Sequence, residues 1–261
     1  MPHRKGVTNL LTVKGVVLTQ KPVGEQDKFI DILTDELGVL EVLVKGAGKI
    51  NSKSGCATQL FAYSAFCLQK GKRGYILNSV SPIRIFYELR SSVTAVALAS
   101  YFSQIVQFSV LPQASNHEIQ RLMLNCLHFL ALKKYPEAIL KSIFELRMAA
   151  LLGFMPDVLM CRTCGEYLPD RLHFSIEDGT FCCKECRSEA DTLAHSVEMT
   201  AGTLQAIRHI VLQDTERVFG FRLSDGCQEA LFAFSEQFLQ YHIDHRFSAL
   251  EYYRAIQNPM V

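Results

Sequence analysis

The 261-residue sequence lacks an excess of charge of either sign, a long hydrophobic run and any low-complexity tract. It contains 27 lysine and arginine residues against 26 aspartate and glutamate residues, a net charge of +1 that argues against a uniformly basic, histone-like protein. No window reaches the roughly 18 consecutive apolar residues of a membrane span, and the N-terminus lacks the apolar core of a signal peptide. The sequence therefore predicts a globular cytoplasmic protein without a membrane segment.

Catalytic signatures are also missing. The sequence contains no G-x-S-x-G, no H-E-x-x-H and no paired-carboxylate motif. A Gly-Ala-Gly-Lys run ending at Lys49 is similar to a P-loop, but Leu43 stands where the Walker order needs glycine and Ile50 where it needs serine or threonine. His242 and His245 are read as a coincidence of helix spacing, and Arg208 as part of a solvated face or a partner contact. We therefore expect no enzymatic activity.

Charge is distributed unevenly along the chain. Residues 1–90 carry 13 lysine and arginine residues and 7 acidic residues, a net +6. Residues 91–261 carry 14 and 19, a net −5. This difference predicts at least two modules that meet different partners.

The basic part has the pattern of a small β-barrel. β-Branched and alternating apolar runs predict five strands at residues 11–19, 29–34, 39–44, 60–69 and 75–80. The second and third strands meet at a turn ending in Gly38, where glycine allows a positive φ. Five short strands in about 70 residues favour a closed barrel, and the OB-fold is the commonest five-stranded barrel. The strand order does not follow from the pattern.

Beyond residue 82 the apolar period changes to that of helices. Three- and four-residue spacings predict helices at 92–110, 116–133, 137–153, 200–213, 225–243 and 248–257. A cysteine-rich segment interrupts them. The fold class is therefore α+β and multidomain: an N-terminal OB-fold barrel and then an all-α domain with an inserted finger. The predicted boundaries are 1–82 for the barrel, 83–156 and 196–261 for the two helical parts, and 157–195 for the finger.

Four cysteines have the spacing of a zinc site. Cys161, Cys164, Cys183 and Cys186 form C-x2-C-x18-C-x2-C. Two such knuckles present four thiolates to one tetrahedral ion, which leaves no open position, so a single zinc ion would be structural. The alternatives are four reduced thiols without metal, a redox pair, Cys182 in place of Cys183, or His173 as a substitute ligand.

Cations gather in two loops of the predicted barrel. Lys45, Lys49 and Lys53 recur at four-residue intervals among glycine, serine and asparagine, and Lys72 and Arg73 occupy a glycine-flanked turn. Such loops suit contacts to phosphates without base specificity. Aromatic residues on the strands serve either as platforms for base stacking or as barrel core; they are Phe29, Phe61, Tyr63, Phe66 and Tyr75.

Local sequence also resembles a known family. The resemblance rests on segments at 16–18, 24–28, 33–38, 44–47 and 52–54, on Phe144-Glu145-Leu146-Arg147 with residues 151–156 before Cys161, and on residues 241–253. Together with the order of barrel, helices and finger, these segments are similar to the RecO family of bacterial DNA-repair and recombination mediators. The likeness spans most of the chain.

The resemblance implies an OB-fold that binds single- and double-stranded DNA and anneals complementary strands. It implies partnership with RecR protein and with single-stranded-DNA-binding protein. Together with these partners, the protein would help to load the RecA recombinase. It also implies a protein that is not an enzyme and that is associated with the bacterial nucleoid. Two other classes stay open on the residues alone: an RNA-binding or translation-associated OB protein with a zinc ribbon, and a zinc-dependent or thiol enzyme.

Overall fold

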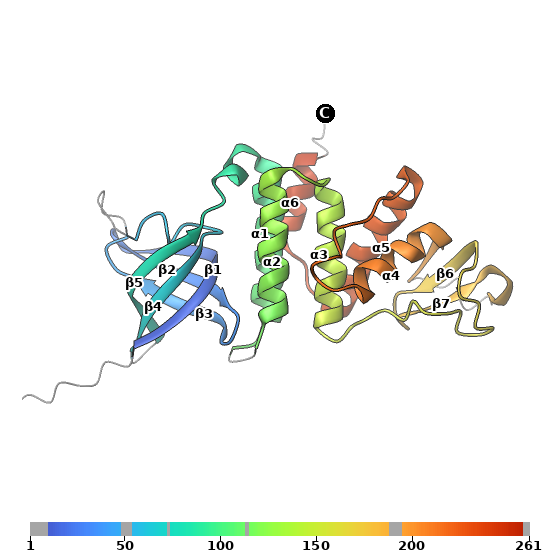
Figure 1. Cartoon of the computed structure of the whole chain (residues 1–261), viewed down its shortest axis with the longest axis horizontal. Coiled ribbons are helices and arrows are strands. Elements are labelled where there is room, and N and C mark those ends of the chain that lie inside the picture. The colour runs from blue at the N-terminus through green and yellow to red at the C-terminus, as the bar shows by residue number, and fades with distance from the viewer. Residues whose placement is uncertain (1–9, 48–53, 72–73, 113–114, 188–194, 258–261) are drawn as a thin grey trace, which may run out of the picture. The chain divides into compact units, whose positions relative to one another are not determined.

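The computed structural model describes residues 10–47, 54–71, 74–112, 115–187 and 195–257 (Figure 1). The chain divides into two compact units, which are described separately. The first comprises residues 1–131 together with 249–261, and the second comprises residues 132–248. Within the described residues no helix is both long and apolar enough to cross a membrane.

The first unit begins with a closed five-stranded barrel, drawn in blue to cyan in Figure 1. Its strands are β1 (Leu10–Val23), β2 (Asp27–Thr34), β3 (Gly38–Val44), β4 (Tyr63–Gly71) and β5 (Gly74–Arg84). The order around the barrel is β1-β2-β3-β5-β4, with β1 antiparallel to β4 and β3 parallel to β5. This arrangement is an OB-fold, so the predicted fold class is confirmed.

Alternation along the strands fills the barrel. Val42 and Val44 of β3, Ile30 of β2 and Phe66 of β4 point inward and are almost completely buried. Their neighbours in sequence face outward because successive side chains of a strand alternate between its two faces. The barrel interior is thus closed by side chains, and any ligand of the barrel must bind to its outer face.

Gly38, the first residue of β3, is required for two reasons, its backbone conformation and its close contact with a neighbouring segment. Its φ is +68°, a left-handed conformation that glycine adopts without strain. A Cβ at this position would also collide with the carbonyl oxygen of Leu111, in the segment that follows the first long helix. Gly38 therefore serves both the turn between β2 and β3 and the close approach of the helical part of this unit.

We expect Gly38→Ala to lower the free energy of unfolding by about 2–4 kcal/mol, since it combines left-handed strain with a backbone clash. Gly24→Ala is the matched control, because Gly24 has φ +60° but no neighbouring atom within 4 Å of the position that a Cβ would occupy. The control should cost only about 1–2 kcal/mol, the strain alone. Urea denaturation of both variants measures the difference, and equal losses would contradict the role of the Leu111 contact.

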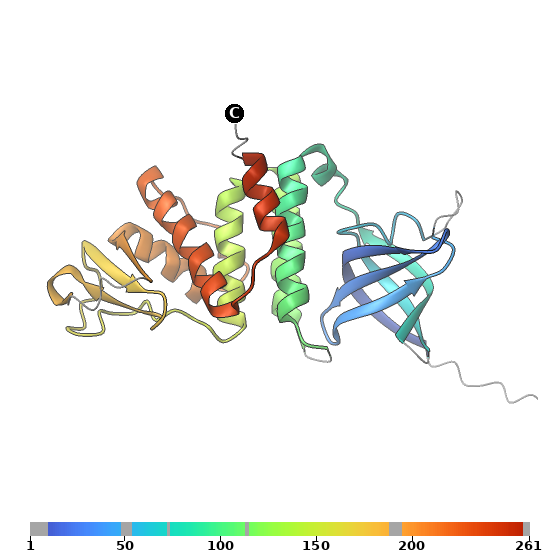
Figure 2. The same cartoon turned by 180° about the vertical axis from the view of Figure 1, so that it is seen from behind.

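Helices complete the first unit. They are the 3-10 helix η1 (Tyr87–Ser91) and the α-helices α1 (Val93–Ser109), α2 (His117–Leu132) and α6 (Ser248–Gln257). Figure 2 shows α6 beside α1, and the backbone N–H of Ala249 donates to the side chain of Gln104 at 3.0 Å. Gln107 of α1 donates to Asp31 at 2.8 Å, and Gln120 of α2 donates to the carbonyl of Leu33 at 3.0 Å. These amides hold the barrel against the helices.

The second unit contains α3 (Glu137–Leu151), α4 (Ala201–Leu212) and α5 (Asp225–Ile243). A three-stranded sheet of order β7-β6-β8 accompanies them, formed by β6 (Arg171–Ser175), β7 (Thr180–Cys183) and β8 (Ser196–Thr200), with the 3-10 helix η2 (Lys184–Cys186) after β7. The ring of Phe174 on β6 meets Phe234 of α5 edge-on, with centroids 4.8 Å apart. The sheet is therefore anchored on α5 by an aromatic contact.

Candidate metal centre and nucleic-acid interface

The four predicted cysteine ligands lie together in the second unit. The Sγ atoms of Cys161, Cys164, Cys183 and Cys186 all lie within 4.8 Å of one another. Those of Cys164 and Cys183 are 3.7 Å apart. Sulfurs about 2.3 Å from one tetrahedral ion would be about 3.8 Å apart. The donor set and its spacing thus fit one four-coordinate metal ion, and four thiolates suit zinc.

The backbone around Cys161 is folded as a knuckle. Gly165 has φ +76° and its N–H donates to the carbonyl of Cys161 at 3.0 Å, which turns the chain back on itself. Burial raises the pKa of the Cys161 thiol, but backbone N–H donors of Cys164, Cys183 and Thr163 outweigh it and lower the pKa to about 6. These donors stabilise a thiolate, the form that binds metal.

The choice between Cys182 and Cys183 follows from strand alternation. The two residues are consecutive on β7, so their side chains leave opposite faces. Cys183 points into the cysteine cluster, while the Sγ of Cys182 accepts from Nε of Arg162 at 3.0 Å. His173 is the cross-strand partner of Cys182 and lies outside the cluster. The preference for Cys183 therefore agrees with the geometry.

Arg208 has a role that the sequence did not reveal. It is 6 % exposed, and its guanidinium on α4 donates to the carbonyls of Val158, Leu159 and Tyr167. Its Cζ lies 4.0 Å from the ring centroid of Tyr167. The expectation of a solvated or partner-facing residue is wrong, because Arg208 is buried and the several donors of its guanidinium are directed at these carbonyls. Arg208 ties the segment around the first knuckle to α4.

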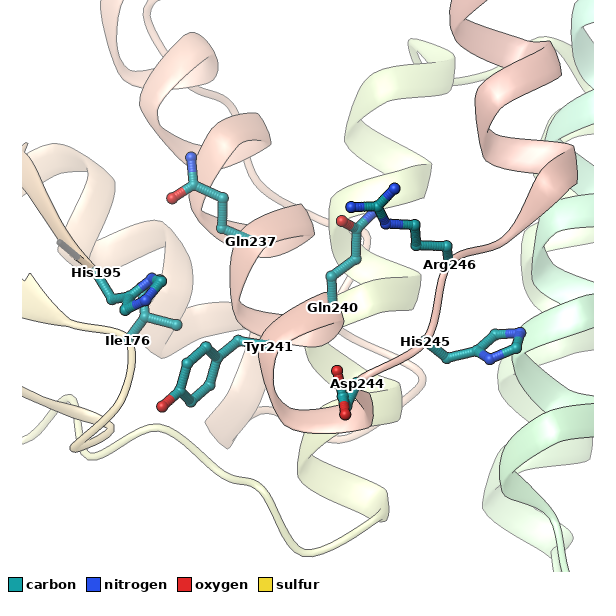
Figure 3. Close-up of a pocket in the computed structure, with 8 residues that line it drawn as sticks. All are labelled: Ile176, His195, Gln237, Gln240, Tyr241, Asp244, His245 and Arg246. Carbon is teal, nitrogen blue, oxygen red and sulfur yellow. The ribbon is translucent and has the colours of Figure 1, made fainter.

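The two histidines three residues apart separate in the structure. His242 packs between Phe154 and Phe238, with ring centroids 5.2 and 4.4 Å away, and burial lowers its pKa. His245 follows α5 and lines a cavity of about 310 Å³ together with Tyr241 and Asp244 (Figure 3). In the described residues neither histidine belongs to a cluster of possible metal ligands.

The predicted basic loops are described only in part. Lys45 is exposed in the turn after β3. Lys49, Lys53, Lys72 and Arg73 lie outside the described residues. The loops themselves leave the barrel at defined places: one follows the end of β3, and the other joins β4 to β5.

The outer face of the barrel carries an apolar row near the end of β3 and the start of β5. Phe29 of β2 pairs with Leu43 of β3, and Leu43 pairs with Ile76 of β5. All three alternate with inward residues and are half-buried. The row crosses the strands that OB-folds use to bind oligonucleotides, together with the β4–β5 loop. The sequence suggested Phe29, but its neighbours depend on strand register, which local patterns do not encode.

The other aromatic candidates divide between core and surface. Phe61 and Phe66 are buried, and Tyr75 packs partly buried against the barrel core. Tyr63 is half-buried at the start of β4. Of the five candidates, Phe29 is thus the one that lies in the outward row with Leu43 and Ile76.

Two carboxylate residues lie at one end of the apolar row. Asp31 pairs with Glu41 one step farther along β2 and β3. Asp31 is buried, and Thr19, Lys21 and Gln107 all donate to its Oδ2. Helix α1 therefore covers Asp31, whereas Glu41 is exposed, and the apolar row lies at the other end of this strand face.

Comparison with known proteins identifies the chain's relatives. The family model described as recombination protein O N terminal matches residues 9–86, and the one described as recombination protein O C terminal matches residues 90–251. A DNA repair protein RecO of Acetivibrio thermocellus is 28% identical over 248 residues, 95% of this chain and 98% of that protein. One of Pelotomaculum thermopropionicum is 28% identical over 235 residues, 90% of each. The resemblance is thereby confirmed: this chain belongs to the RecO family of DNA repair proteins.

Proposed function

We propose that the protein is a recombination mediator that binds single- and double-stranded DNA through its barrel and anneals complementary strands. The observation that carries the proposal is the outward row of Phe29, Leu43 and Ile76 beside Lys45 and the β4–β5 loop. Stacking on an exposed ring and contacts between lysines and phosphates are the two interactions that bind single strands without regard to sequence.

The basic loops extend this interface. Lys45 stands at the base of a loop that also contains Lys49 and Lys53, and the β4–β5 loop adds Lys72 and Arg73. These residues are proposed to contact phosphates on either side of the apolar row. Base-edge readout is not needed, because repair acts on any sequence. The net charge of +6 over residues 1–90 supports the same assignment.

The metal centre is proposed to hold one structural zinc ion. Cys161, Cys164, Cys183 and Cys186 would be its ligands, and a fully occupied set of four thiolates leaves no site for a water nucleophile. The ion would stabilise the short sheet and its two knuckles. On this proposal the protein acts by binding, without catalytic turnover, and works in the cytoplasm at the nucleoid.

The proposed partners are RecR protein and single-stranded-DNA-binding protein, with which the chain would help to load RecA recombinase. Membership of the RecO family supports a role in repair and recombination. Loading of RecA replaces the single-stranded-DNA-binding protein that coats the strand. A mediator of this replacement is expected to contact proteins as well as DNA.

We expect Phe29→Ala to weaken binding of oligothymidine about tenfold, since stacking of one base on an aromatic ring contributes about 1–3 kcal/mol. The change removes an outward side chain and leaves the barrel core in place. Fluorescence anisotropy of a labelled strand measures the affinity, and annealing of two complementary strands should slow in parallel.

Tyr252→Ala is the control for this experiment, because Tyr252 is an exposed aromatic residue on α6. It should bind as the unaltered protein does. Equal affinity of the Phe29→Ala variant and the unaltered protein would remove the row from the interface. A strong preference for RNA over DNA of the same sequence would instead favour an RNA-binding protein.

A further inference from the structure

Two adjoining cavities lie in the second unit, on either side of the segment that leads into α5. One, of about 600 Å³, opens between this segment and the start of α3. The other, of about 370 Å³, opens between the segment and α4. Both share Phe221, Arg222 and Leu223 as lining residues. We call the pair the helical groove; its combined size is in the range of ligand-binding sites.

The groove differs from its surroundings in charge. Residues 91–261 carry 19 acidic residues against 14 lysine and arginine residues. Yet none of the described residues that line either cavity is an aspartate or a glutamate, while Lys134, Arg222 and His209 do line them. Lys134 and Arg222 are exposed. Lys134 and Arg222 are thus the charged side chains that line the groove, with Asp225 beyond its edge as the partner of Gln228, and two lining cations are complementary to an anionic ligand.

Aromatic rings line the same groove. Tyr135 and Phe219 are stacked with centroids 6.3 Å apart, and Nζ of Lys134 lies 5.4 Å from the centroid of Tyr135. Phe221 lies against His209, with ring centroids 5.2 Å apart. Tyr135 and Phe221 are only half-buried, so part of each ring is accessible to a ligand. Cations beside accessible rings are the pattern of a site for single-stranded nucleic acid.

We propose that the helical groove binds a second segment of single-stranded nucleic acid, with bases against Tyr135 and Phe221 and phosphates at Lys134 and Arg222. This rests on the proposed function and deepens it, because annealing requires two strands to be held by one protein. The two cavities in series suit an extended ligand rather than a compact one. Membership of a DNA-repair family favours a nucleic-acid strand over an acidic peptide, which has similar charge.

The test uses the full-length, metal-loaded protein and an oligothymidine of about 8 nucleotides, within the site size of one OB-fold. Titration should saturate at two strands for each chain. Arg222→Glu should reduce this to one strand and slow the annealing of complementary strands about tenfold. Lys133→Glu makes the same charge change on an exposed residue that lines neither cavity, so it should still bind two.

A local readout is available in the wall of the second cavity. Cys227 lines this cavity and is half-buried. Excess oligothymidine should therefore slow its alkylation by N-ethylmaleimide, followed by peptide mass, at least fivefold in the unaltered protein. The same excess should leave the alkylation rate of Cys227 unchanged in Arg222→Glu.

The outcomes separate this inference from the proposed function. If each chain bound a single strand, if this binding depended on Phe29, and if oligothymidine did not protect Cys227, the groove site would be wrong. The barrel site would still be supported. Binding of no strand at all would overturn both. If Arg222→Glu instead lost affinity for a labelled peptide of alternating aspartate and phenylalanine while still binding two strands, the groove would be a peptide site and the proposal wrong.

Discussion

Cys183→Ser is expected to abolish metal binding and to unfold the two knuckles, whereas Cys182→Ser should keep one zinc ion for each chain. Cys183 contributes its Sγ to the four-cysteine cluster, and Cys182, its neighbour on β7, points to Arg162 instead. Structural zinc contributes an apparent free energy of about 10–16 kcal/mol to the folding of isolated finger peptides, so this is the largest effect we predict. Elemental analysis of the purified variants measures the zinc content.

Unfolding after metal loss should be local. Phe174 of β6 stays in contact with Phe234 and Phe238 of α5, and that apolar contact does not depend on the ion. Limited proteolysis of Cys183→Ser should therefore cut first within residues 157–187 and spare α3 and α5. Metal retained by Cys183→Ser and lost from Cys182→Ser would reverse the assignment of the ligand. An unaltered protein without metal after purification with zinc would contradict the centre itself.

Lys141→Met should destabilise the second unit by about 3–5 kcal/mol, the cost of leaving a buried charge without its partner. Nζ of Lys141 lies 2.8 Å from a carboxylate oxygen of Glu145 and 2.8 Å from one of Glu236. Glu145 is fully buried and also accepts from Ser235 at 2.7 Å. Urea denaturation followed by circular dichroism gives the change in free energy of unfolding.

The pH dependence of this variant gives a second check. Burial already raises the pKa of Glu145 while Lys141 lowers it, so removing Lys141 raises the folded-state pKa further above the unfolded value. The folded variant then binds a proton more readily than the unfolded chain, and its stability rises as the pH falls. The deficit should shrink as the pH is lowered from neutral toward the pKa of an unfolded glutamate, about 4.3. Lys141→Met with Glu145→Gln should be more stable than the single variant at neutral pH. If the loss of stability in Lys141→Met did not depend on pH, it would not arise from an unpaired charge on Glu145.

The sequence predicted the elements of the barrel better than their arrangement. Alternating apolar residues place Val42 and Val44 inside the barrel, and this local pattern is enough to predict a strand. The parallel pairing of β3 with β5 rests on contacts such as Val42 with Tyr75, more than thirty residues apart. No local pattern encodes that register, so the outward row at Phe29 could be predicted only as a single residue.

The clustering of the four cysteines could be predicted from the sequence, because knuckle spacing is a local property. The choice between Cys182 and Cys183 depends on β7, where alternation sends one side chain to each face and places Cys183 in the cluster. Arg208 was missed for the opposite reason. Its partners are carbonyls 41 to 50 residues earlier in the chain, and a helix pattern does not show them.

The central claim, that the barrel and its basic loops bind DNA strands, is tested most directly by the salt dependence of oligothymidine binding. The comparison is between the unaltered protein and the triple variant Lys45→Ala, Lys49→Ala and Lys53→Ala. Three lost phosphate contacts should weaken binding and flatten the slope of log K against log salt by about 2. Unchanged affinity and slope in the triple variant would contradict the account.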